Sequence, residues 1–284
     1  GKQVLRANTY MGTTEAWDMP SEPGCIAPAA NGGLVLALRD GVFRARTWGG
    51  ALERLATLPY DPTYHRANDG KCDALGRFWV GTLDETRTSG NAGLYCVDAR
   101  ELATRGAPHV TAMVSPDTQP ATTANGLAFS PDNRTVYWTD TPSHTVWAWD
   151  YDLQANTLSN KTVFATIRPK LAGWLSNPLD ADNGHYRGRP DGAAVDSQGN
   201  YWVALFEGRR VAQFAPDGGL LAEIAVPMQC PTAVCFGGED LKTLYLTSAM
   251  HHRSASELTA FPVSGQVLAM RVEVAGLPCH FFVD

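Results

Sequence analysis

The chain has 284 residues, 44% of them hydrophobic and 18% charged, a composition that excludes a disordered or collagen-like protein. Its 23 basic and 29 acidic side chains give a formal net charge of −6, and a mildly acidic surface does not favour nucleic acid as a partner. The longest uninterrupted apolar run, residues 201–206, is too short to span a membrane, so we expect no membrane partner either.

The six cysteine residues are widely spaced and form no Cys-x-x-Cys or Cys/His zinc motif. A chain of this size does not need disulfide bonds to stabilise its core. We therefore expect free thiols and a cytoplasmic location. The sequence makes no prediction of the oligomeric state.

Short β-rich runs recur along the chain after turns that contain Gly, Asp or Asn, whereas helical periodicity is nearly absent. The copies follow turns that begin at Ala30, Asp73, Ser130, Asp196 and Gly237. Their spacing is about 40–45 residues where it is shortest, which is typical of the four-stranded blades of a β-propeller.

The copy that begins at Asn125 shows the complete repeat unit. Its predicted strands are residues 125–130, 135–139, 145–151 and 160–165. Ahead of the first complete copy, residues 3–9 and 14–18 are predicted as two further strands, in the positions of the third and fourth strands of a blade.

These repeats predict an all-β fold, a six-bladed β-propeller of four-stranded blades that forms a single domain over residues 1–284. Five blades are complete, and the two N-terminal strands form half of the sixth. A closed propeller leaves no open sheet edge, so the first two strands of that blade are expected upstream of Gly1. A five-bladed ring with an N-terminal flap is the alternative.

Equivalent positions of the repeats carry polar side chains. Five residues before each turn stand Cys25, Asn68, Asn125, Asp191 and Thr232. The innermost strand of every blade starts at one mouth of the central channel, so these positions are expected to converge. Amide and carboxylate oxygens suit Ca²⁺, Mg²⁺ or Mn²⁺, with Zn²⁺ possible. The alternative is that Asn-Gly and Asp-Gly are here ordinary turn dipeptides.

Several blocks resemble the SMP-30/gluconolactonase family, which includes regucalcin and bacterial sugar lactonases. Residues 66–83 read RANDGKCDALGRFWVGTL and are similar to a signature of that family. The blocks NGLAFSPD at 125–132, PDG at 190–192 and CFGG at 235–238 match it in the same order.

The resemblance implies a propeller that binds one divalent cation (Ca, Zn, Mn or Mg) through a Glu, an Asn and an Asp. The Asn carries over to Asn125 and the Asp to Asp191, while Arg66 and Asn68 carry over as substrate-binding residues. The family's Glu belongs to an early Glu-x-Pro-x-Trp motif that this sequence lacks. We expect that Glu upstream of Gly1, with the missing half-blade.

Other polar residues have less specific interpretations. Glu15 falls in a fourth-strand position and Glu22 in a connecting turn, so neither replaces the absent Glu. Glu85 is interpreted as a solvated loop acid and His65 as a surface histidine. The insertion at residues 171–189 is either a substrate lid or a tolerated surface loop.

The family resemblance implies a metal-dependent lactonase that hydrolyses a sugar lactone, its small-molecule partner, to the aldonic acid. Asp191 would be both a metal ligand and the catalytic general base, and Arg66 and Asn68 would orient the sugar. No nucleophile elbow, P-loop or dinucleotide motif occurs. The alternatives are a calcium- or carbohydrate-binding propeller without turnover and a broader metal-dependent ester or organophosphate hydrolase.

Overall fold

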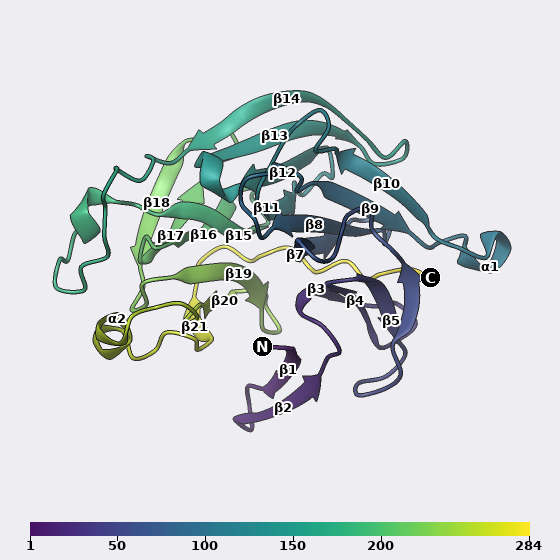
Figure 1. The fold of residues 1–284 in the computed structure, drawn as a ribbon, viewed down its shortest axis with the longest axis horizontal. Coiled ribbons are helices and arrows are strands. Elements are labelled where there is room, and N and C mark those ends of the chain that lie inside the picture. Colours follow the sequence, from purple (N-terminus) through teal and green to yellow (C-terminus); the bar gives the residue numbers. More distant parts are fainter. The chain divides into compact units, whose positions relative to one another are not determined.

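Antiparallel strands are the main regular structure of the chain in the computed structural model, which describes residues 1–284 (Figure 1). The chain divides into two compact units, one formed by Gly1–Ala124 with Cys279–Asp284 and the other by Asn125–Pro278. Neither unit contains a helix that is long and apolar enough to cross a membrane.

The first unit contains three sheets and one short helix, α1 (Leu102–Arg105). The two-stranded sheet is formed by β1 (Gln3–Asn8) and β2 (Thr13–Asp18). One four-stranded sheet contains, in order, β3 (Pro23–Pro28), β4 (Leu34–Leu38), β5 (Gly41–Ala45) and β6 (Glu53–Ala56). The other contains β7 (His65–Cys72), β8 (Phe78–Asp84), β9 (Leu94–Asp98) and β10 (His109–Val114).

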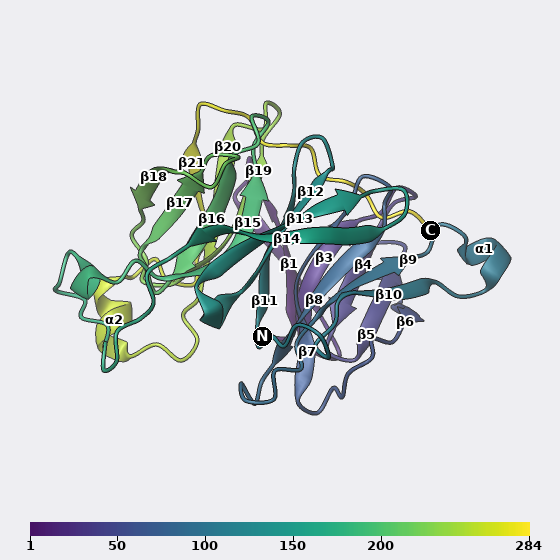
Figure 2. The ribbon, with the colours of Figure 1, turned by 90° about the horizontal axis from the view of Figure 1, so that it is seen from above.

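The second unit also contains three sheets, whose strands follow one another in chain order (Figure 2). The first sheet contains β11 (Ala124–Phe129), β12 (Thr135–Asp140), β13 (Thr145–Asp152) and β14 (Thr157–Thr166). The second contains β15 (Arg189–Val195), β16 (Tyr201–Phe206), β17 (Arg210–Phe214) and β18 (Leu220–Ala225). The third contains β19 (Pro231–Gly237), β20 (Thr243–Ser248) and β21 (Leu268–Arg271). The helices are η1 (Thr141–Ser143), η2 (Asn183–His185) and α2 (Ala255–Ala260).

A buried aspartate builds the turn between the first two strands of two of these sheets. The Asp196 carboxylate accepts hydrogen bonds from the backbone N–H groups of Gln198 and Asn200, each at 3.0 Å. It also accepts one from Nε1 of Trp202 at 2.9 Å. Asp73 makes the same three kinds of contact after β7. These bonds explain why Asp and Trp recur six residues apart in the repeats.

Apolar side chains fill the space between consecutive sheets of one unit. In the second unit Tyr137 of β12 and Tyr201 of β16 pack with ring centroids 5.2 Å apart, and both belong to one buried cluster with Phe214. In the first unit Phe282, near the C-terminus, packs against Phe78 of β8 with ring centroids 6.4 Å apart. The alternating apolar residues of each strand therefore face a neighbouring sheet.

The predicted strands are confirmed, but the predicted number of blades is wrong. Residues 125–165 form β11 to β14 as expected, and β1 and β2 occupy the two N-terminal strands. Only five sheets have three or four strands, so the structure has five blades, and β1 and β2 pair only with each other. The last blade has three strands, and the chain after β21 forms only single bridges, Gly276 with Asp196 and Phe282 with Ala29. The single domain over residues 1–284 stays a prediction.

The turn aspartates generate a prediction about stability. Asp196→Ala leaves two backbone N–H groups and a buried indole N–H without their acceptor, so it should lower the free energy of unfolding by about 2–4 kcal/mol. Asp217→Ala, which removes an exposed turn aspartate bonded to Gly219, should cost less than about 1 kcal/mol. Urea unfolding measures both changes, and equal losses would contradict this account of the turn.

Candidate functional site

In four sheets, the first strand contains an extra residue near its start, which has no partner of its own on the neighbouring strand. The irregular stretches contain Gly24 in β3, Asn68 and Asp69 in β7, Asp191 and Gly192 in β15, and Thr232 in β19. Such β-bulges redirect side chains and are frequent beside binding sites. The positions that the repeats predict to be equivalent at 68, 191 and 232 therefore share one local structure.

The Asn-Gly and Asp-Gly pairs lie inside strands, so their interpretation as ordinary turn dipeptides is wrong. Gly126 has a φ of +63°, and a Cβ atom there would lie 2.4 Å from the Tyr201 hydroxyl oxygen. A Cβ atom on Gly192 would lie 2.6 Å from the Cβ atom of Ala233. Both glycines are thus required because a neighbouring strand approaches closely.

Arg66 and Asn68 contact each other in the first unit. Nη1 of Arg66 donates to Oδ1 of Asn68 at 3.1 Å, and to the carbonyl oxygen of Ala67 at 3.0 Å. Nδ2 of Asn68 donates to the carbonyl oxygen of Ala124 at 2.9 Å. The bulge thus brings the guanidinium and the amide together, with the amide orientation fixed by the backbone.

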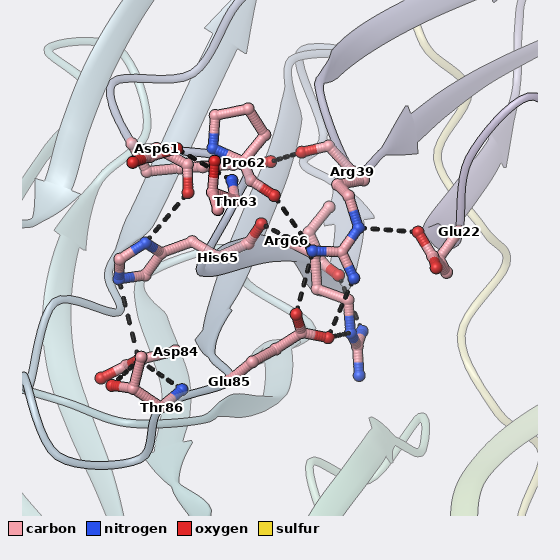
Figure 3. A network of polar contacts seen from close by, with 12 residues as sticks. Glu22, Arg39, Asp61, Pro62, Thr63, His65, Arg66, Asp84, Glu85 and Thr86 are labelled. Carbon is pink, nitrogen blue, oxygen red and sulfur yellow. Dashed lines mark hydrogen bonds and ion pairs between the residues drawn. The ribbon is translucent and has the colours of Figure 1, made fainter.

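A network of ion pairs surrounds Arg66 (Figure 3). Arg39 donates to both carboxylate oxygens of Glu85 at 2.9 Å and to Glu22 at 2.7 Å. Nε of Arg66 lies 3.4 Å from the same Glu85 carboxylate. Hydrogen bonds from Arg39 lower the pKa values of both acids. Glu85 lies in the turn after β8 with its side chain 39% exposed, as predicted for a solvated loop acid, and it is also ion-paired. Sequence reasoning missed Arg39, because the sequence of a β-turn does not show which distant residue its side chain will contact.

His65 is buried rather than on the surface, contrary to its predicted position. It begins β7, its side chain is 9% exposed, and its Nδ1 lies 3.2 Å from the carbonyl oxygen of Asp61. Its Nε2 lies 3.9 Å from the Asp84 carboxylate (Figure 3). The ring packs beside Tyr60, with centroids 6.1 Å apart, which explains its burial.

Asn125 and Asp191 belong to the second unit, where Thr141 links their strands. Nδ2 of Asn125 donates to the Thr141 hydroxyl at 2.8 Å, and that hydroxyl donates to the carbonyl oxygen of Pro190 at 2.8 Å. Pro190 directly precedes Asp191. Asn125 is buried, at 5% exposure. Sequence reasoning missed Thr141, since its only signal is a hydroxyl residue that follows the second strand of a repeat.

The chemistry of these donors fits a hard divalent cation. Asn125 contributes an amide whose nitrogen faces Thr141, so a cation would bind its oxygen, and Asp191 contributes a carboxylate. No group of three or more His, Cys, Asp or Glu side chains is arranged to hold a metal ion. Arg66 and Asn68 lie in the first unit, and the predicted cation ligands Asn125 and Asp191 lie in the second.

Comparisons with known proteins agree with the family resemblance. The sequence model of the SMP-30/gluconolactonase/LRE-like region matches residues 1–250. A 6-deoxy-6-sulfogluconolactonase from Pseudomonas putida is 42% identical, over 96% of this chain and 85% of the relative. A regucalcin from Danio rerio is 31% identical, over 99% of this chain and 88% of the relative.

A solved structure shows the fold as well. The crystal structure of a calcium-binding protein, regucalcin, from Agrobacterium tumefaciens matches with a TM-score of 0.84 and 24% identity. The match covers 99% of this chain and 86% of that protein. With the successive antiparallel sheets, this similarity shows an all-β propeller.

Asp84, beside His65, generates a prediction about pH. Burial opposes its ionisation, but hydrogen bonds from Ser89 and Thr86 outweigh burial and lower its pKa to about 2. An unfolded aspartate titrates near pH 3.9, so this stabilisation is present above that pH and is lost as the pH falls through about 2.

Between pH 4 and 2, the free energy of unfolding of Asp84→Asn should therefore fall by about 2 kcal/mol less than that of the wild type. Ser89→Ala, which removes one donor, should give an intermediate slope. Urea unfolding at several pH values measures the slopes. Identical slopes in all three proteins would show that the carboxylate is not held in this way.

Proposed function

This chain belongs to the SMP-30/gluconolactonase/LRE-like family, and we propose that it hydrolyses a sugar lactone to the aldonic acid with the help of one divalent cation. The observation that carries the proposal is the Asn125–Thr141–Pro190 link, which holds an amide beside the strand of Asp191 in a lactonase-like chain. The sulfogluconolactonase from Pseudomonas putida supports the lactone as substrate, and the calcium-binding regucalcin supports the cation.

In this proposal Asn125 and Asp191 hold the cation, which is Ca, Zn, Mn or Mg. A bound divalent cation supplies Lewis acidity, which polarises the lactone carbonyl and stabilises the negative charge that develops on its oxygen. Asp191 accepts a proton from the attacking water while the water oxygen bonds to the carbonyl carbon. The ring C–O bond then breaks, and the released ring oxygen takes that proton from Asp191, which restores the carboxylate and gives the hydroxyl of the aldonic acid.

Arg66 and Asn68 are proposed to bind the sugar hydroxyls. Their mutual hydrogen bond and the Glu85 carboxylate fix the direction of the guanidinium, which favours one orientation of the sugar ring. A cytoplasmic location is also proposed, and the six free cysteines support it.

The proposed reaction is tested with a panel of pentono- and hexonolactones, an aryl ester and a phosphotriester. Release of acid is followed with a pH indicator, with and without EDTA. We expect acid from at least one sugar lactone, with the rate abolished by EDTA and restored by a divalent salt. Turnover of the ester or phosphotriester alone would support the broader hydrolase, and no turnover with cation binding intact would support a calcium-binding propeller.

The role of Asp191 is tested by Asp191→Asn, with Asn68→Ala as the matched variant. Asp191→Asn keeps the shape and one oxygen but loses both the charge and the proton acceptor. Turnover should therefore fall by about 10²–10⁴-fold even at saturating metal. Asn68→Ala should impair turnover while cation affinity stays nearly normal. Calorimetry gives the metal occupancy in each case. Near-normal turnover of metal-saturated Asp191→Asn would leave Asp191 as a ligand only.

A further inference from the structure

A cluster of charged side chains in the second unit, hereafter the Glu207 cluster, contains Lys170, Arg189, Arg253, Glu207 and Glu257. The Glu207 carboxylate contacts Lys170, Arg189 at 3.3 Å and Arg253 at 3.4 Å, and its side chain is only 9% exposed. Arg253 also donates to both oxygens of Glu257, at 2.7 and 2.6 Å. Three cations thus face two carboxylates, so the cluster carries one positive charge that no anion in it balances.

Buried polar atoms without a partner border this cluster. They are Nδ1 of His144, the hydroxyl oxygen of Tyr186 and Nε of Arg189. Tyr186 is 3% exposed and His144 is 7% exposed, and their rings pack 6.0 Å apart. The Lys170 ammonium lies 5.5 Å from the centre of the Tyr186 ring.

A buried polar atom without a hydrogen bond costs about 1–3 kcal/mol, so a water molecule or ligand that supplied partners to these three atoms would stabilise the protein. The guanidinium Nε can only donate, and the phenol can donate. The pKa of His144 is lowered by burial and by the neighbouring Arg189 guanidinium, as expected where positive charge is in excess. Donors around unbalanced positive charge favour an anion.

The segment that carries Tyr186 is held by hydrogen bonds to buried side chains. Arg209 donates to the carbonyl oxygens of Asp180 and Asn177, both at 2.7 Å. Asn183, at 1% exposure, donates to the carbonyl oxygen of Tyr186 at 2.9 Å. Buried side chains thus hold the part of the insertion that leads to Tyr186, while Leu175 and Leu179 are exposed.

The cluster adjoins the proposed cation ligands. Arg189 and Asp191 are two residues apart on β15, about 6–7 Å along a strand. Thr141, which accepts from Asn125, donates to the carbonyl between them and belongs to η1, which His144 directly follows. A substrate whose carbonyl lies at Asp191 would therefore place its far end near Arg189.

We propose that the Glu207 cluster, with Tyr186 and His144, binds a sulfonate on the carbon of the sugar lactone farthest from the carbonyl. This inference rests on the proposed lactone hydrolysis. Its chemistry agrees with the relative from Pseudomonas putida, whose name specifies a 6-sulfo substituent. The Lys170 and Arg189 side chains are 30% and 22% exposed, so part of the cluster faces solvent.

The substrate arm of the test compares 6-deoxy-6-sulfogluconolactone with gluconolactone, which has a hydroxyl in place of the sulfonate. Arg189→Gln should lower kcat/KM for the sulfonated lactone about 10–100-fold more than for gluconolactone, mainly through KM. Arg168→Gln, an exposed arginine of the same unit, should leave this ratio as it is.

The Tyr186→Phe variant distinguishes a role of Tyr186 in sulfonate binding from a purely structural role. Its hydroxyl has no partner within the protein, so a purely structural Tyr186 predicts no change or a gain in stability. A sulfonate ligand predicts a further loss of about 3–10-fold that is specific to the sulfonated lactone. An unchanged ratio in both Arg189→Gln and Tyr186→Phe would overturn the proposal.

The binding arm does not depend on turnover. Calorimetry with methanesulfonate, and with uncharged methanesulfonamide, measures the affinity of the cluster directly. Wild-type protein should bind methanesulfonate but not methanesulfonamide. Arg189→Gln should bind methanesulfonate at least about tenfold more weakly than the wild type. If no lactone is hydrolysed but this pattern holds, the proposed function fails and the sulfonate site stands. If lactones are hydrolysed but methanesulfonate binds equally to both proteins, the sulfonate site is overturned.

Discussion

The extra residue near the start of the innermost strands is the constraint on which the account of this protein depends. In a regular ladder, side chains alternate between faces, and the apolar residues that follow in β7 and β15 must face the neighbouring sheets. The bulge interrupts that alternation, so an amide or a carboxylate stands at the start of the strand without displacing the core. Its geometry restricts the neighbours, since a Cβ atom on Gly81, opposite the bulge of β7, would lie 2.7 Å from Ala124.

Carboxylates hold the arginine side chains of both units in defined directions. Glu85 lies between Arg39 and Arg66 in the first unit, and Glu207 lies among three cations in the second. Partly buried ion pairs add little to net stability, because desolvation offsets most of the Coulomb attraction. Their value here is geometric, since a guanidinium that is already oriented loses less entropy when it binds a hydroxyl or a sulfonate.

Much of the local structure could be predicted from the sequence because it depends on neighbouring residues. Turns that contain Gly, Asp or Asn, followed by β-rich runs, mark the strands, so the sequence predicts β11 to β14 to within a few residues. The number of blades could not be predicted in this way, because it depends on which distant strands pair. Likewise the partner of Glu85 is Arg39, a turn residue of another sheet, and the burial of His65 depends on how the preceding loop folds over it. The Glu207 cluster is assembled from four separate segments and leaves no local pattern.

The central claim, that the bulge of β15 and the start of β11 together present a cation site, is tested most directly by paramagnetic broadening. Mn²⁺ is titrated into isotopically labelled protein while backbone amide signals are recorded. The account predicts that the signals of Asn125, Gly126, Asp191 and Gly192 broaden together at the lowest Mn²⁺ concentrations, and that Asp191→Asn removes this effect. Broadening that begins elsewhere and leaves these four signals sharp would contradict it.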